Sequence, residues 1–157
     1  GVNGKAYTIA GVVQNPDTTS FVDVTAKNVG VKYTYKIRTY KTFGDVTYNS
    51  AFGGEKTGSY VPAVKLKKFT SASAGTAKVT YNKVAKATGY QIQYADNASF
   101  KSAKTANVNG GSVTSKTIKR LTKGKRYYVR VRSFKKIDGK VYYSAWSGKK
   151  SVVIKKR

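Results

Sequence analysis

Several residue types that carry protein chemistry are missing from this sequence of 157 residues. It has no Cys, no His and no Met, and only six Asp and Glu residues. Without Cys or His the chain cannot form a disulfide, a thiol nucleophile, a Cys–His zinc site or a Ser–His–Asp triad. There is also no apolar run of about 18 residues, so no transmembrane helix or other insertion into a membrane is expected.

The six carboxylates do not form a recognisable catalytic pair. A glycosidase needs two carboxyl groups held about 5–9.5 Å apart. Asp45 and Asp138 adjoin Gly in expected hairpin turns, and Asp17 and Asp96 lie in expected loops. The spacing of a calcium-binding loop is absent as well. We therefore expect a protein that is not an enzyme and has no metal site and no cofactor.

Positive charge is the most prominent feature that is present. The chain has 31 Lys and Arg residues against six acidic ones, a net charge of +25. Residues 1–62 hold seven basic and four acidic residues, net +3, whereas residues 63–157 hold 24 and two, net +22. Such a field attracts polyanions and weakens with salt. The charge serves either as a solvated face that promotes solubility or as a means of retention on an anionic polymer.

Short runs of alternating apolar and polar residues predict half-buried β-strands. No stretch keeps a period of 3.6 residues over three turns, and Gly-containing turn sequences separate the runs. The clearest predicted strands are residues 76–81, 90–94, 117–121, 127–131 and 150–154. We therefore predict an all-β protein with strands at the spacing of a sandwich.

An internal repeat divides the chain in two. The matching blocks are 30–41 with 124–135 and 48–52 with 142–146, both at an offset of 94, and 5–9 with 88–92 at an offset of 83. A repeat of this length is the size of one immunoglobulin-like sandwich. We therefore predict two repeats, residues 1–62 and residues 63–157.

The second repeat resembles a bacterial fibronectin type III domain, of the lysine-rich kind found in tandem on secreted and surface proteins of Gram-positive bacteria. The blocks that carry the resemblance are residues 87–94, 117–132 and 140–147. One departure is Tyr81, which stands where the family often has a core Trp. The resemblance implies immunoglobulin-like β-sandwiches in tandem, with residues 63–157 forming a complete domain.

The first repeat is incomplete. Residues 1–62 begin at the loop that would precede the third strand, so the first two strands have no counterpart. A fragment boundary or an unusual N-terminal variant would explain this, and so would strands supplied by another polypeptide, because an open sheet edge is a template for pairing. The sequence starts with Gly and has no Met, and we expect it to be part of a larger polypeptide or assembly.

The end of the second repeat predicts a ladder of aromatic rings and arginines. Arg130 and Arg132 alternate with apolar residues on a predicted strand, so they point outward together. Residues 143–147 resemble the Trp-Ser-x-Trp-Ser stretch of cytokine-receptor fibronectin domains. That resemblance implies a structural cation–π ladder of Arg130, Arg132, Tyr143 and Trp146. The alternative for Trp146 is an exposed ring that stacks on a sugar.

Two tyrosines at the starts of matching predicted strands each predict a tyrosine corner. Tyr127 follows a Gly-containing turn, and Tyr33 is its partner in the first repeat. This placement matches a tyrosine corner, in which the hydroxyl group bonds nearby backbone.

The resemblance implies a secreted or cell-surface module of a Gram-positive bacterium, acting as a spacer and as a wall-associated or adhesive element. Its partner would be an anionic cell-wall polymer, such as teichoic acid, or another protein. The basic residues predicted to hold the polymer lie close in sequence: Lys116, Lys119, Arg120, Lys123, Lys125 and Arg126.

The sequence also allows partners of other classes. The main alternative is specific binding of a host or partner protein through loops or an open sheet edge. A third is a carbohydrate-binding accessory module that holds neutral glycans through exposed Trp146 or Tyr residues. No recognition helix or RNA-binding strand signature occurs, and Lys outnumbers Arg, so no specific binding of nucleic acid is expected.

Overall fold

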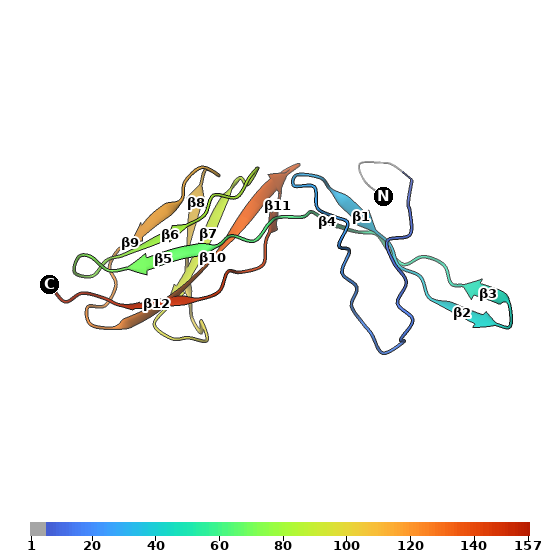
Figure 1. The fold of residues 1–157 in the computed structure, drawn as a ribbon, viewed down its shortest axis with the longest axis horizontal. Helices are drawn as coiled ribbons and strands as arrows, with labels where there is room; N and C mark the ends of the chain where they lie inside the picture. The colour runs from blue at the N-terminus through green and yellow to red at the C-terminus, as the bar shows by residue number, and fades with distance from the viewer. Residues whose placement is uncertain (1–5) are drawn as a thin grey trace. The chain divides into compact units, whose positions relative to one another are not determined.

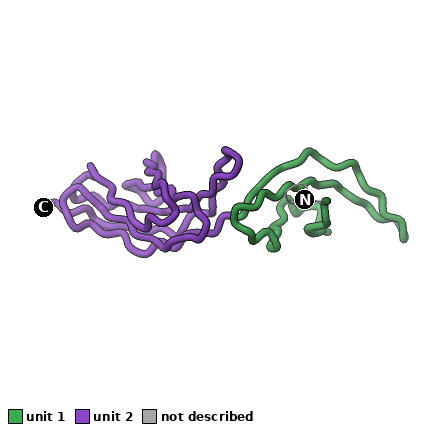
Figure 2. Tube along the Cα trace, turned by 90° about the horizontal axis from the view of Figure 1, so that it is seen from above, with its two compact units in different colours: residues 1–60 green, residues 61–157 purple. Residues whose placement is uncertain are grey.

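The computed structural model describes residues 6–157 and contains strands, turns and loops with no helix in that range. Figure 1 shows the twelve strands in chain order. The all-β class predicted from the alternating pattern is confirmed. The chain divides into two compact units, Gly1–Tyr60 and Val61–Arg157, coloured separately in Figure 2. The repeat pattern of the sequence predicts a boundary two residues later, after residue 62.

Unit 2 is a sandwich of two antiparallel sheets. The smaller sheet has the order β5-β6-β9, and the larger has the order β11-β10-β7-β8 with β12 also paired to β10. The strand bounds are β5 Leu66–Thr70, β6 Ala77–Tyr81, β7 Gly89–Ala95, β8 Lys104–Asn109, β9 Ser115–Ile118, β10 Arg126–Ile137, β11 Lys140–Tyr143 and β12 Lys150–Val153. The long β10 is central, because it pairs with β7 along one edge and with β12 and then β11 along the other.

One predicted strand differs at its end from the observed one. The sequence pattern predicts a strand through residue 121, whereas β9 ends at Ile118. The reason is a turn in which Arg120 adopts a φ of +60°, a conformation outside the β region. This turn delivers Leu121 to the core from a loop, where it is buried.

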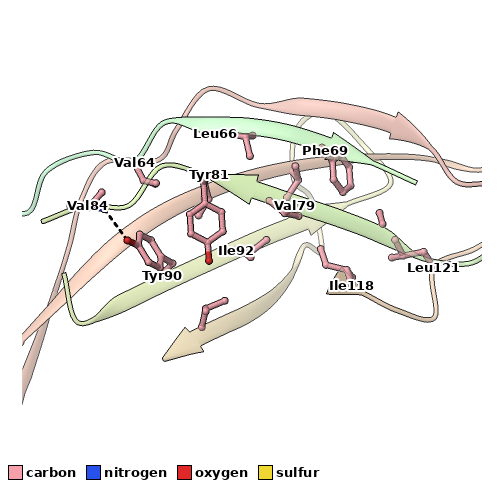
Figure 3. Close-up of a cluster of buried hydrophobic side chains, with 14 of the residues drawn as sticks. Val64, Leu66, Phe69, Val79, Tyr81, Val84, Tyr90, Ile92, Ile118 and Leu121 are labelled. Carbon is pink, nitrogen blue, oxygen red and sulfur yellow. Dashed lines mark hydrogen bonds between the residues drawn. The ribbon is translucent and has the colours of Figure 1, made fainter. Parts of the chain in front are cut away.

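The core of unit 2 lies between its two sheets, as Figure 3 shows. Alternate residues of the strands point inward, including Val79 and Tyr81 on β6 and Tyr90 and Ile92 on β7. The Tyr90 hydroxyl accepts a hydrogen bond from Val84 N at 2.9 Å and donates to a backbone carbonyl at 2.8 Å. Tyr81, at the position where the resemblance implies a core Trp, is buried with its ring centroid 4.6 Å from that of Tyr90. Burial raises the pKa of Tyr81.

Unit 1 consists of two short antiparallel ribbons. β1 (Tyr33–Tyr35) pairs with β4 (Lys56–Gly58), and β2 (Tyr40–Phe43) pairs with β3 (Val46–Asn49). Among the described residues of this unit, Tyr33 is the only buried hydrophobic side chain. The repeat block at residues 5–9 forms no strand in its described part, and Lys5 lies outside the described residues.

Candidate functional site

Side chains on the outer face of the larger sheet of unit 2 form an alternating stack of rings and guanidinium groups. The Arg130 guanidinium carbon lies 4.3 Å from the centroid of the Phe100 ring and 4.8 Å from that of Trp146. The Arg132 guanidinium carbon lies 4.3 Å from the Trp146 centroid and 3.8 Å from that of Tyr143. The structure therefore brings together the four residues that the sequence places in a ladder, and it adds Phe100.

Two glutamines of β7 orient the arginines of this stack. Arg130 lies opposite Gln93 and Arg132 opposite Gln91 in the strand register. Arg130 Nε donates to Gln93 Oε1 at 2.7 Å, and Arg132 donates to Gln91 Oε1 through Nε at 3.0 Å and Nη2 at 2.7 Å. Burial, and after it the charge of Arg130, lowers the pKa of Arg132, although an arginine stays protonated at neutral pH. The amide partners fix the geometry and leave both positive charges in place.

Phe100 is the stack residue that the sequence does not reveal. It lies in the loop after β7 with a φ of +57°, which is a rare conformation for a bulky residue. The Asn97 side chain organises this loop, since it accepts from Lys101 N and donates to Lys101 O, both at 2.9 Å. An Asn in a loop is a signal for such a turn, but the direction of the ring depends on backbone angles that the sequence pattern does not show.

Trp146, for which the sequence leaves open a role in stacking on a sugar, is already in contact with two arginines of the stack. Two guanidinium groups already lie over its ring, and the side chain is half-buried. These contacts match those of the predicted structural ladder, whose role stays a prediction, as does sugar binding at Trp146.

The tyrosine side chains predicted at the two corners make matching contacts. Thr122 N donates to Tyr127 Oη at 3.3 Å, and Asn28 N donates to Tyr33 Oη at 3.3 Å. In both units the bonded backbone group lies five residues before the tyrosine. Each bond ties the incoming loop to the start of the strand.

The six basic residues predicted for polyanion binding are all exposed, and they follow the chain from β9 to the start of β10: Lys116, Lys119, Arg120, Lys123, Lys125 and Arg126. Two of them have partners within the protein. Lys125 Nζ lies 3.4 Å from Asp96 Oδ2, and Arg126 Nη1 donates to Ser151 Oγ at 3.4 Å.

A hollow of about 400 Å³ lies beside part of this segment. Its lining includes three cationic side chains, two phenol rings and one carboxylate, from Lys104, Lys119, Arg120, Tyr94, Tyr127 and Asp96. Arg120 is one of several non-Gly residues with a positive φ, here +60°, a conformation that the turn after β9 requires. The predicted patch thus contributes Lys119 and Arg120 to the hollow, while Lys104, Tyr94 and Tyr127 come from other strands.

Asp96 is the acidic residue in this hollow, and it is engaged by neighbours. Hydrogen bonds from the Asn97 side chain and from Lys125 hold the pKa of Asp96 below its ordinary value. The carboxylate is therefore ionised at neutral pH, and the cation paired with it is Lys125.

Unit 1 has a shorter version of the ladder. Lys36 Nζ lies 4.1 Å from the centroid of the Tyr7 ring and 4.5 Å from that of Phe52, and the Arg38 guanidinium carbon lies 4.8 Å from the Phe52 centroid. Phe52 thus occupies the place that Trp146 has in unit 2.

The described part of the chain lacks sites of two other kinds. Within residues 6–157, no group of three or more Asp, Glu, Cys or His side chains is placed to hold a metal ion. Over the same residues, no helix has the length and hydropathy needed to cross a membrane.

Comparisons with known proteins identify the fold. No protein-family model and no curated protein sequence matches the chain. The structure is similar to the fn3 domain of human contactin 1, with a TM-score of 0.53 and 18% identity over 62% of this chain and 81% of that chain. It is also similar to the FN1–FN3 domains of chicken CNTN1, with a TM-score of 0.53 and 15% identity over 85% of this chain and 46% of that chain. The fibronectin type III sandwich predicted from the sequence is therefore confirmed as a fold.

Proposed function

We propose that unit 2 is a non-catalytic binding module of a secreted or surface-attached bacterial protein, and that it holds anionic polymers of the cell envelope. A fibronectin type III fold serves many functions, so the fold alone does not select a ligand. The observation that carries the proposal is the hollow lined by Lys104, Lys119 and Arg120 together with Tyr94 and Tyr127.

The chemistry of this hollow suits a phosphate or carboxylate attached to a sugar or polyol. The ammonium groups of Lys104 and Lys119 act as point charges, while the guanidinium of Arg120 can bind two oxygens of one anion. The two phenol rings offer apolar surface to the carbon skeleton next to the charge. The other basic residues of unit 2, which has a net charge of +22, attract the polymer from a distance.

The experiment is a sedimentation assay of the full chain with purified Gram-positive cell walls, before and after removal of teichoic acid, across a series of salt concentrations. We expect binding that requires the anionic polymer and that falls steeply as salt increases. Binding that is indifferent to both treatments would contradict the proposal.

A matched pair of double variants separates the hollow from the general field. Lys119→Gln with Arg120→Gln removes two charges at the hollow, and Lys135→Gln with Lys136→Gln removes two near the far end of β10, roughly 30 Å from Tyr127 at the rise of a strand. We expect the first pair to weaken binding at least about tenfold more than the second. Equal losses would show that the charge acts without a defined site.

A further inference from the structure

Unit 2 has a second pocket, between the strands β5 and β12. It has a volume of about 320 Å³, and its lining comes from these two strands alone: Lys67, Lys68, Phe69 and Thr70 of β5, and Lys150 and Ser151 of β12. Among the described residues, those that line this β5–β12 pocket include three lysines and two hydroxyl groups but no carboxylate. The hollow described above, in contrast, includes Asp96.

The β5–β12 pocket and the hollow lie at opposite edges of the sandwich. In the smaller sheet β6 separates β5 from β9, and in the larger sheet β10 and β7 separate β12 from β8. The hollow has lining residues on β7, on β8 and in the turn after β9. At the usual spacing of about 4.8 Å between strands, β12 and β8 are about 14 Å apart. An anion bound at one edge therefore leaves the other edge accessible.

An irregularity in β5 places two consecutive lysines at this pocket. Between Leu66 and Lys68 the register shifts, so that two residues of β5 correspond to one residue of β6. Regular alternation along a strand turns one of two neighbouring side chains inward, but Lys67 and Lys68 are both exposed. The flanking Leu66 and Phe69 are both buried. A bulge of this kind re-aims a side chain, and here it gathers positive charge on one wall of the pocket.

Hydrogen bonds beyond the ends of the two strands hold the walls of the pocket together. Lys155 N donates to Ser71 Oγ at 3.1 Å, and Ser71 Oγ donates to Thr76 O at 2.6 Å. Gly75 N donates to Lys155 O at 3.4 Å. The chain after β12 is thereby attached to the turn between β5 and β6, so the fold of unit 2 fixes the pocket.

Arg126 adds a guanidinium group next to the β12 wall. Its Nη1 donates to Ser151 Oγ at 3.4 Å. The preceding residue, Lys125, pairs instead with Asp96, which lines the hollow. The basic segment from β9 to β10 therefore divides at the start of β10, with one cation directed to each edge of the sandwich.

We propose that the β5–β12 pocket is a second binding site for a phosphate or carboxylate group, and that unit 2 thus holds two segments of an anionic polymer at once. The identity of the polymer rests on the proposed function. The ammonium groups of Lys67, Lys68 and Lys150 supply the charge. The hydroxyl groups of Thr70 and Ser151 can donate hydrogen bonds to the oxygens of the anion. Because the two sites open at opposite edges, one module can join two polymer chains and gains avidity for a repeating ligand.

Nuclear magnetic resonance of the isotopically labelled full chain locates the bound anion. The probe is a short oligomer of glycerol phosphate, added at about 0.15 M salt, where charges on the surface are screened. We expect saturable shifts of the amide signals of Thr70 and Ser151. Lysines and a bulge on an edge strand also keep that strand from pairing with another chain, and this role alone predicts no such shifts. Their absence would overturn the proposal.

A matched pair of double variants separates the pocket from the general charge of unit 2. Lys67→Gln with Lys150→Gln should weaken the affinity that these two amide signals report at least about tenfold. Lys135→Gln with Lys136→Gln removes the same charge elsewhere and should change it by less than about twofold. Equal losses would overturn the proposal. All four lysines are at least partly exposed, so an unchanged melting temperature is the check that both variants fold.

The proposed function and the second site can fail separately. Binding to cell walls without shifts at Thr70 and Ser151 would reject the second site alone. Shifts at Thr70 and Ser151 without binding to cell walls would reject the proposed function and support the pocket as an anion site.

Light scattering tests whether one module joins two polymer chains. Mixed with purified teichoic acid at about 0.15 M salt, the natural chain should increase the scattering of the polymer. The variant with Lys67→Gln and Lys150→Gln should not, although it still sediments with cell walls through the hollow. The variant with Lys135→Gln and Lys136→Gln should scatter like the natural chain. Undiminished scattering by the first variant would overturn the joining of two chains by this pocket.

Discussion

The two units of this protein contain the same two strand pairings, β1–β4 and β2–β3 in unit 1 and β10–β12 and β10–β11 in unit 2. They differ in burial, because only in unit 2 does a second sheet cover these strands. In unit 2 these strands pack against β5, β6 and β9, and Val129 and Val131 are completely buried. In unit 1 Ile37, which matches Val131 at the offset of 94, is exposed, while the strand register and the tyrosine corner are the same. A segment of about 30 residues is therefore enough to form these local interactions. Burial of its apolar side chains, in contrast, requires strands that are distant in sequence.

The largest expected effect concerns the matched isoleucines of the two units. Ile92→Ala should lower the free energy of unfolding of unit 2 by about 2–5 kcal/mol, because it leaves a cavity at a fully buried position. Ile9→Ala, at an exposed position, should change stability by no more than about 0.5 kcal/mol. Urea denaturation followed by Trp146 fluorescence and by far-ultraviolet circular dichroism measures both. A comparable loss in the two variants would show that unit 1 has a core of its own.

The next effect concerns the ladders. Arg130 lies over two rings, and because each exposed cation–π contact is worth about 0.5–1 kcal/mol, Arg130→Ala should destabilise unit 2 by about 1–2 kcal/mol. The melting temperature should fall by about 4–8 °C for each kcal/mol in a domain of this size. Lys36→Ala, at the matching position of unit 1, is the control and should leave the melting temperature of unit 2 unchanged. An unchanged melting temperature for Arg130→Ala would mean that the stack does not stabilise the fold.

The sequence predicts part of the stack of unit 2 but not the hollow. The strand period predicts that Arg130 and Arg132 point outward together. Their neighbours Tyr143 and Trp146 were implied by the resemblance of residues 143–147 to the Trp-Ser-x-Trp-Ser stretch, and not by the period. The hollow could not be predicted, because Lys104 and Tyr94 reach it from β8 and β7, and the sequence does not show which strands meet there. The contact of Phe100 with Arg130 could not be predicted for a related reason, since a positive φ in a loop decides where the Phe100 ring points.

A smaller effect is expected at the tyrosine corners. Tyr127→Phe removes a hydroxyl group that accepts from Thr122 N, and we expect a loss of about 0.5–1.5 kcal/mol in unit 2. Tyr33→Phe removes the same bond to Asn28 N. Because little of unit 1 is buried, that variant should not move the cooperative transition that Trp146 reports. If both variants shift this transition equally, the two units unfold as one and the separation drawn between them fails.

The smallest effect is a pH dependence at Asp96 of unit 2. The hydrogen bonds from Asn97 and Lys125 lower the pKa of Asp96 in the folded state. The resulting stabilisation is therefore complete above the unfolded pKa, about 3.9, and is lost as the pH falls through the lower folded value. The Asp96→Asn variant should show a shallower loss of melting temperature below about pH 4 than the natural chain. An identical slope would mean that the two hydrogen bonds do not stabilise the ionised carboxylate.

The same Asp96→Asn variant separates stability from binding in the hollow. It removes the one negative charge among the residues that line the hollow, so it should tighten binding of an anionic polymer at neutral pH even as it removes the contact with Lys125. In unit 1, Asp23 also has a lowered pKa, through hydrogen bonds from Thr25, but it is not part of the hollow. Asp23→Asn is therefore the matched control, with the same change of charge and a smaller change in affinity. Equal gains in affinity from the two variants would assign the binding to net charge alone, and a gain confined to Asp96→Asn would assign it to the hollow.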